Sequence, residues 1–201
     1  MKTIAHSISN APQIGKLAIT SKAKGREGFE MRSLEVRSSA RDHRQGYLTV
    51  GPLTLRVALG RSGIGLLKRE GDGHTPRAAL RLLYGFWRAN RVARPQTRLP
   101  MIPSRETMVW CDDPKSPAYN RLSRLPLTES HETMCRGDRL YDIVMVLDWN
   151  VSSRRRGAGS AIFLHLARPG YKPTEGCIAV SERDMRRLLA VADRGTSIHV
   201  K

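Results

Sequence analysis

Residues 160–165 read Ser-Ala-Ile-Phe-Leu-His, and residues 174–178 read Thr-Glu-Gly-Cys-Ile. The first stretch is a strand-like apolar run that ends in a histidine. The second places a cysteine directly after a glycine, at the start of another apolar run. Residues twelve positions apart lie side by side on neighbouring strands when the loop between them turns back. We therefore expect the imidazole of His165 to meet the thiol of Cys177, the minimal pair for an activated sulfur nucleophile.

Each residue of this pair also has a structural interpretation. A free cysteine is most often a small buried apolar side chain, and a lone histidine can be a hydrogen-bonded core residue. A free thiol titrates near ~8.5, so catalysis at neutral pH needs a partner such as His165, which would act as general base and acid. We expect Gly176 to leave room for a carbonyl beside the sulfur and to let the N–H groups of Gly176 and Cys177 reach an oxyanion. Thr174 either shapes the turn or helps to hold the site.

Three further motifs precede this pair in the chain. Residues 68–76 read Lys-Arg-Glu-Gly-Asp-Gly-His-Thr-Pro, residues 110–114 read Trp-Cys-Asp-Asp-Pro with Tyr119-Asn120 after them, and residues 140–144 read Leu-Tyr-Asp-Ile-Val. Together with His165 and Thr-x-Gly-Cys, they resemble a proteobacterial branch of the L,D-transpeptidase (YkuD-type) catalytic-domain family. The resemblance runs from about Gly46 to Lys201.

This resemblance implies a mainly β (α+β) fold, a β-sandwich or barrel with a helix after the cysteine strand. It implies a peptidoglycan L,D-transpeptidase in which Cys177 forms a thioester with one stem peptide and an amine of a second stem resolves it. Water as acceptor would instead make a carboxypeptidase or endopeptidase. The partners implied are stem peptides and glycan strands in the periplasm or cell wall. No metal or organic cofactor is required, and a carbapenem is expected to acylate Cys177.

Departures from the family pattern bear on the donor substrate. The family commonly has Gly after the histidine and Arg or Asn two residues after the cysteine, where this chain has Leu166 and Ala179. The usual donor is the diamino acid at stem position three. Some members of the family instead use the L-alanine at position one and have a proline-rich segment near their site. The missing Arg or Asn and the six prolines between Pro95 and Pro126 resemble that variant, so we favour the L-alanine donor, which gives a 1,3-crosslink.

Five residues outside the Cys-His pair are candidate substrate contacts. Arg168 and Lys172 lie in the His-to-Cys loop, where they are either solvated charges or the groups that hold a donor carboxylate. Asp112, Tyr119 and Asn120 either contact substrate or only stabilise the Pro-rich segment. Long segments of this kind are often lids or binding loops.

The charge of the chain favours a polyanionic partner without identifying it. Lys and Arg number 35 against 18 Asp and Glu, which gives +17. Such a field attracts nucleic acid, anionic lipid or anionic cell-wall polymer, and it is equally typical of a solvated basic surface. The alternative of a nucleic-acid-binding protein lacks a recognition helix, an aromatic RNA-binding motif or a zinc finger, so no specific nucleic acid is expected.

Cysteine usage leaves one thiol unpaired, because Cys111, Cys135 and Cys177 are odd in number. Cys177 is the natural free thiol, and a Cys111–Cys135 bridge is possible. His131 near Cys135 and Cys111 does not have the spacing of a zinc knuckle, so no metal is expected. No apolar run approaches the ~18 residues of a membrane helix. The first residues show no signal-peptide core, in contrast with the periplasmic location that the resemblance implies.

The remaining pattern predicts one catalytic domain over residues 46–201 after a basic, flexible segment at residues 1–45. Residues 47–50 and 53–59 flank Gly51-Pro52, which predicts a hairpin. Residues 77–90 fit a basic helix or a strand, and the family resemblance favours the strand. Residues 95–126 are expected to be mostly irregular. Residues 141–148, 160–167 and 196–200 are predicted strands, and a capping pattern at Ser181 predicts a helix to about Ala192.

Overall fold

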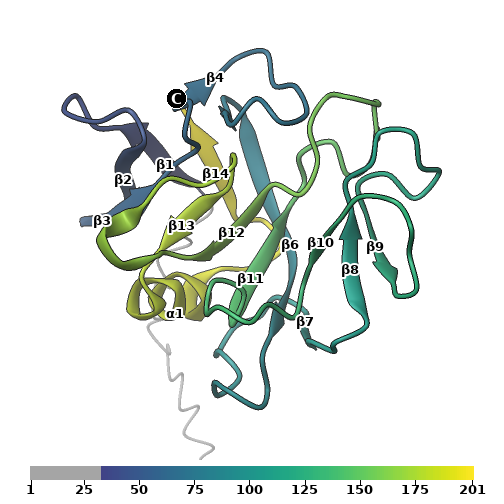
Figure 1. Ribbon diagram of the computed structural model, residues 1–201. Coiled ribbons are helices and arrows are strands. Elements are labelled where there is room, and N and C mark those ends of the chain that lie inside the picture. The colour runs from purple at the N-terminus through teal and green to yellow at the C-terminus, as the bar shows by residue number, and fades with distance from the viewer. Residues whose placement is uncertain (1–32) are drawn as a thin grey trace, which may run out of the picture.

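The computed structural model describes residues 33–201, which form a mainly β fold (Figure 1). Its strands are β1 (Ser33–Ser38), β2 (Gln45–Val50), β3 (Leu53–Ala58), β4 (Ile64–Gly65), β5 (Thr75–Pro76), β6 (Ala79–Trp87), β7 (Met101–Pro103), β8 (Met108–Cys111), β9 (Arg121–Arg124), β10 (His131–Thr133), β11 (Ile143–Leu147), β12 (Phe163–Leu166), β13 (Ile178–Val180) and β14 (Ser197–Val200). A short 3-10 turn, η1, spans Pro169–Tyr171, and the helix α1 spans Glu182–Val191. The prediction of a mainly β fold with a helix after the cysteine strand is confirmed. No helix within residues 33–201 is long and apolar enough to cross a membrane.

The large sheet closes on itself. Its strands follow the order β11-β12-β13-β3-β2-β1-β14-β6-β7, and β11 pairs with β6 as well as with β12. Most neighbours are antiparallel, but three pairs run parallel: β12 with β13, β1 with β14, and β6 with β7. The closed sheet therefore encloses a core and presents the β12–β13 pair to the outside.

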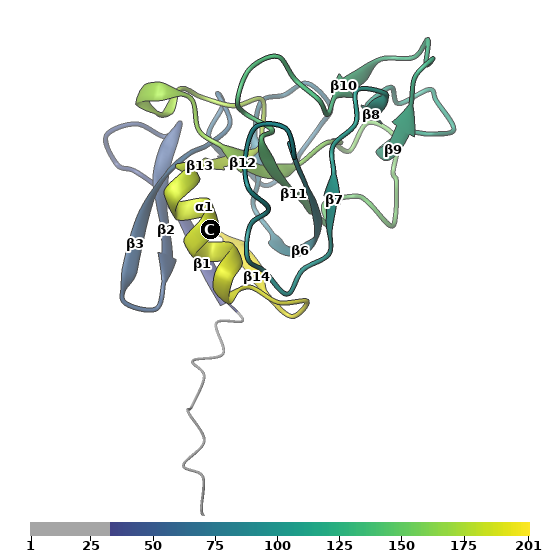
Figure 2. The ribbon, with the colours of Figure 1, turned by 90° about the horizontal axis from the view of Figure 1, so that it is seen from below.

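Helix α1 covers one end of this closed sheet (Figure 2). It begins at the predicted cap, where the Ser181 side chain accepts a hydrogen bond from the Asp184 N–H. Its buried residues Met185, Leu188 and Leu189 join the main hydrophobic core with the inward side chains of the strands. Burial of each such leucine contributes roughly 2 kcal/mol. The helix thus anchors the segment that follows Cys177.

A second, smaller cluster covers the outer face of β11 and β12. The strands β10, β8 and β9 form a separate three-stranded sheet, which stands beside β11 in Figure 1. Trp110 of β8 packs edge-to-face on Phe163 of β12, with ring centroids 5.2 Å apart. Tyr141 contacts the same Phe163 ring at 5.8 Å, and Cys177 belongs to this cluster. The cysteine therefore lies between the closed sheet and the small sheet.

Several predicted elements are confirmed, and one prediction needs correction. The hairpin is β2–β3, and the segment 77–90 contains the strand β6 rather than a helix. Residues 95–126 are mostly irregular, as predicted, with the short strands β7, β8 and β9 among them. The segment 1–45 was predicted to be flexible, but Ser33–Ser38 forms β1, which pairs with β2 and β14. The remainder of that prediction, residues 1–32, lies outside the described residues.

Candidate active site

The register of β12 and β13 places His165 and Cys177 on one face. In this parallel pair Leu164 lies opposite Ile178, and His165 lies opposite Ala179. Alternate residues of a strand point to the same side, so Cys177 shares the face of Ala179 and therefore of His165. The strand spacing puts the two α-carbons about 8 Å apart on the diagonal. Both side chains line one cavity of about 340 Å³.

His165 has its tautomer set by the backbone. Its Nδ1 lies 2.8 Å from the carbonyl oxygen of Leu166, which can only accept, so Nδ1 carries the proton and Nε2 is the basic nitrogen. The ring packs edge-on against Tyr141, with centroids 5.3 Å apart. Burial lowers the pKa of His165 to about 4, and the Leu166 carbonyl opposes this shift. The imidazole is therefore neutral at pH 7 and able to accept a proton.

Cys177 rests as a thiol. Its Sγ donates to the carbonyl oxygen of Ala161 at 3.2 Å and accepts from the N–H of Phe163 at 3.4 Å. Burial raises the pKa of Cys177 to about 12, while the Phe163 N–H acts in the opposite direction by favouring the thiolate. The resting pair is thus a neutral thiol and a neutral imidazole. A proton has to move during the reaction rather than before it.

The turn before Cys177 is held by Thr174. The Thr174 hydroxyl donates to the Cys177 carbonyl at 2.7 Å and accepts from the Gly176 N–H at 3.2 Å. Gly176 has φ 133°, and a Cβ there would lie 2.7 Å from the carbonyl oxygen of His74, so a side chain does not fit. The expectation that the Gly176 N–H faces an oxyanion is wrong for this structure, because that N–H is bonded to Thr174. The glycine instead allows the close approach of His74.

The loop that carries His74 is braced by a buried ion pair. Lys68, with a side chain only 2% exposed, pairs with Asp72. Burial acts to raise the pKa of Asp72, but hydrogen bonds from Lys68 and from the N–H groups of Arg69 and His74 bring it to about 2. This pair therefore fixes residues 68–74 against the turn that precedes Cys177.

Four of the predicted substrate contacts and site-shaping residues line the catalytic cavity: Thr174, Arg168, Lys172 and Asp112. Gly176, Tyr119 and Asn120 do not line it. Tyr119 donates its hydroxyl hydrogen to Glu70, and burial together with this bond raises its pKa well above the usual value. Asn120 is 1% exposed. These two residues lie behind the cavity wall rather than at its surface.

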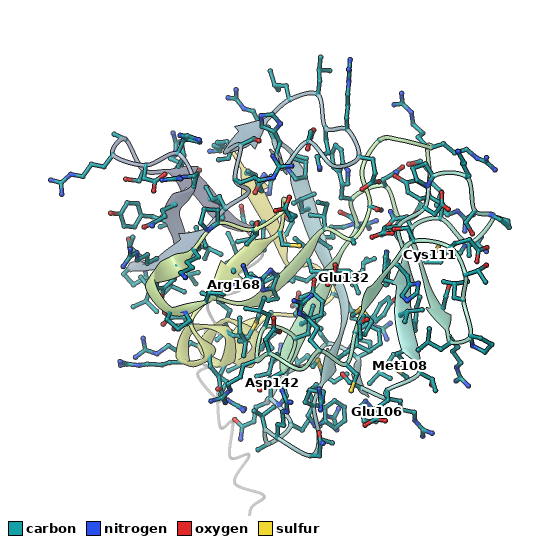
Figure 3. The ribbon with its side chains drawn as sticks, in the orientation of Figure 1. Glu106, Met108, Cys111, Glu132, Asp142 and Arg168 are labelled. Carbon is teal, nitrogen blue, oxygen red and sulfur yellow. The ribbon has the colours of Figure 1, made fainter. Side chains whose placement is uncertain are left out.

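Sequence reasoning missed several lining residues, including Glu70, Glu132, Arg136 and Tyr141. Glu132 extends from β10, whereas Arg168 lies in the loop after β12 (Figure 3). Arg136 pairs with Glu132 and Asp138 and lies over the Tyr141 ring. Glu70 and Tyr141 carried a signal, because each lies inside one of the motifs quoted from the sequence. The cavity therefore has carboxylates from residues 70, 112, 132 and 175, and cations from residues 136, 168 and 172.

A second cavity of about 620 Å³ adjoins the first. Leu140 and Arg168 line both cavities. The other walls of the second cavity include the apolar side chains Leu166, Pro169 and Tyr171. The two cavities thus share Leu140 and Arg168 as lining residues, and the second cavity is largely apolar.

The three cysteines are all free thiols, so Cys111 and Cys135 are not bridged. Cys111 is buried in β8, and Cys135 is partly exposed. Neither of them lines the catalytic cavity. Cys177 is the thiol that shares a cavity with a histidine.

Comparison with known proteins gives one family match and one similar solved structure. A family model described as "YkuD: L,D-transpeptidase catalytic domain" matches residues 39–200. No curated protein matches the chain. A solved structure of Mycobacterium tuberculosis L,D-transpeptidase 1 aligns with 84% of this chain at 13% identity and a TM-score of 0.38. The alignment spans 61% of the length of that mycobacterial protein.

Proposed function

We propose, from the premise that this chain belongs to the YkuD family of L,D-transpeptidase catalytic domains, that it crosslinks peptidoglycan stem peptides through a Cys177 thioester. The observation that carries the proposal is the pair of neutral Cys177 and neutral His165 on one face of β12–β13, lining a single cavity. That pair can supply a nucleophile and a base to an amide carbonyl.

Acylation begins with attack of Sγ on the scissile carbonyl carbon. Because the Cys177 pKa is about 12, the sulfur is not ionised beforehand, so its proton passes to Nε2 of His165 as the carbon–sulfur bond forms. The Leu166 carbonyl holds the Nδ1 proton and stabilises the imidazolium that results. The oxyanion takes its hydrogen bond from the N–H of Cys177, since that of Gly176 donates to Thr174. The carbon–nitrogen bond then breaks, and His165 returns the proton to the leaving amine.

Deacylation reverses these steps with a new amine. The acceptor amine attacks the thioester carbonyl, His165 takes its proton, and the sulfur leaves and is reprotonated. Leaving and attacking amines occupy the same position relative to Sγ and Nε2, because both exchange a proton with His165. Because Leu140 and Arg168 line both cavities, we place in the second cavity the peptide beyond the scissile amide and, after it leaves, the acceptor stem.

The proposed donor is the L-alanine at stem position one. Ala179 lines the cavity where the family commonly has Arg or Asn, so the position offers no charge to a carboxylate beside the scissile bond. Arg168 and Lys172 line the same cavity and supply cations farther along the groove. The Pro-rich segment contributes Asp112 to the cavity wall. Cleavage inside a longer stem needs no carboxylate next to the bond, and this site suits it.

Mass spectrometry of muropeptides incubated with the protein tests this proposal. Crosslinked dimers should appear with the parent protein and be absent with Cys177→Ala. Tandem fragmentation should locate the donor at L-alanine. Exclusive linkage through the position-three diamino acid would reject the donor and keep the thioester chemistry. Released monomers without any dimer would instead indicate a carboxypeptidase or endopeptidase.

A further inference from the structure

The sulfur of Cys177 is held by a bend in the chain before β12. The carbonyl of Ala161 accepts from Sγ, and the N–H of Phe163, two residues later, donates to it. Both groups reach one atom because Ala161 adopts φ 51°, a left-handed conformation that is uncommon for a residue with a side chain. We name residues 161–163 with these two bonds the sulfur seat. The conformation of Ala161 sets the position of the nucleophile.

The side chain of Asn120, which does not line the cavity, is hydrogen-bonded to the sulfur seat. Its Oδ1 accepts from the N–H of Ala161 at 3.1 Å and from the indole Nε1–H of Trp110 at 2.9 Å. Its Nδ2 donates to the Trp149 carbonyl at 3.2 Å. Asn120 is 1% exposed and is itself left-handed, with φ 55°. Every polar atom of the amide side chain is therefore committed to a protein partner.

We propose that Asn120 is a positioning residue for Cys177, acting through Ala161, rather than the substrate contact that the sequence suggested. Burial removes it from the cavity, and its hydrogen bonds leave no group for a ligand. Without the Oδ1 acceptor, the part-buried Ala161 N–H loses its protein partner, and a donor left unsatisfied there drives local rearrangement. The Ala161 carbonyl and the Phe163 N–H then no longer converge on Sγ.

Two substitutions at Asn120 separate the effect of the Oδ1 acceptor on Cys177 from the effect of the left-handed backbone conformation at residue 120. Asn120→Gly removes the acceptor, and Asn120→Asp keeps an oxygen at its place; glycine and aspartate both tolerate a positive φ. At saturating carbapenem, Asn120→Gly should acylate Cys177 at least about tenfold more slowly, with the half-saturating concentration little changed. Asn120→Asp should recover most of that rate. Trp110→Phe, which removes the other donor to Oδ1, should lower thermal stability but leave the acylation rate within about twofold.

The pH profile of Cys177 alkylation by iodoacetamide supplies a readout that does not need the proposed function. Loss of the Phe163 N–H bond should move the midpoint upward in Asn120→Gly, whereas Trp110→Phe, which introduces no charge, should leave it in place. A parent-like acylation rate in Asn120→Gly, an equal loss in Asn120→Asp, or an equal loss in Trp110→Phe would each overturn the inference. If the carbapenem fails to acylate the parent protein, the proposed function is in question, while the alkylation profiles still decide the role of Asn120.

Discussion

The two faces of β12 carry different side chains, although the strand contributes two residues to each. Leu164 and Leu166 point inward and pack in the main core with α1. Phe163 and His165 point outward, where Tyr141 and the small β10-β8-β9 sheet cover them in part and leave a cavity at His165 and Cys177. The inner face is continuous and apolar, so it carries stability. The outer face is incompletely covered, so its polar groups are both buried enough to have shifted pKa values and open to a substrate.

The sharpest test of this division is Cys177→Ala. Alanine fits the small outer site, so the melting temperature should change little, while acylation and crosslinking should fall below detection. Cys111→Ala and Cys135→Ala are matched controls, since both are free thiols outside the cavity, and they should retain activity. Undiminished crosslinking by the Cys177→Ala protein would contradict the proposal that Cys177, on the outer face, is the nucleophile.

His165→Ala should reduce the acylation rate by about a hundredfold or more, the usual contribution of a general base. The pKa of His165 is lowered to about 4, so in the parent protein the basic form should persist down to about pH 5 and be lost as the pH falls through 4. Stopped-flow acylation against pH measures this. A parent rate that already declines between pH 7 and 6 would mean that burial does not hold the imidazole neutral.

Much of the outer face could be predicted from local pattern, because His165 and Cys177 end and begin two short apolar runs joined by one loop. The hairpin and the cap of α1 were likewise readable from neighbouring residues. Partners that are distant in sequence were not readable. Pairing of β1 with β14 joins the two ends of the described chain, and Asn120 acts on Ala161, 41 positions away. A periodic pattern records which face a residue occupies but not which distant element covers it.

On the inner face, Leu164→Ala should cost about 2–5 kcal/mol of unfolding free energy, because it leaves a cavity in the closed core. At a temperature where the variant stays folded, its acylation rate should remain within a few-fold of the parent. Leu53→Ala, at a position 49% exposed on β3, should change stability by less than about 0.5 kcal/mol. Denaturant titration compares the three proteins. Equal stability of the two variants would contradict the assignment of stability to the inner face.

Protonation of Asp72 in acid should break its ion pair with Lys68 and lower the free energy of unfolding. Its folded pKa of about 2 lies below the ordinary 3.8, so it adds stability above pH 4 that is lost as the pH falls toward 2. The shift corresponds to about 2 kcal/mol. Asn at position 72 cannot titrate, so Asp72→Asn should be less stable at pH 7 and its unfolding free energy should fall less between pH 4 and 2. If the unfolding free energies of parent and variant change with pH in parallel, the Lys68–Asp72 pair does not contribute this pH-dependent stability.

The smallest effect is expected at the junction of the two cavities. Arg168 lies at the edge of the outer face and lines both spaces, so it can hold a carboxylate of whichever peptide extends past the scissile bond. A partly solvated ion pair contributes up to about 1 kcal/mol, which corresponds to about fivefold in binding. Arg168→Ala should therefore shift the acyl-enzyme about fivefold from amine transfer toward hydrolysis. Carbapenem acylation should change less, because it does not require that peptide.

Arg156→Ala is the matched control, since Arg156 is exposed and lines neither cavity. The ratio of dimer to hydrolysed monomer, measured by mass spectrometry at several acceptor concentrations, separates weaker acceptor binding from slower chemistry. If a high acceptor concentration restores the parent ratio, Arg168 contributes binding at the junction. If the ratio stays low at saturation, Arg168 instead affects His165, whose pKa its charge helps to lower.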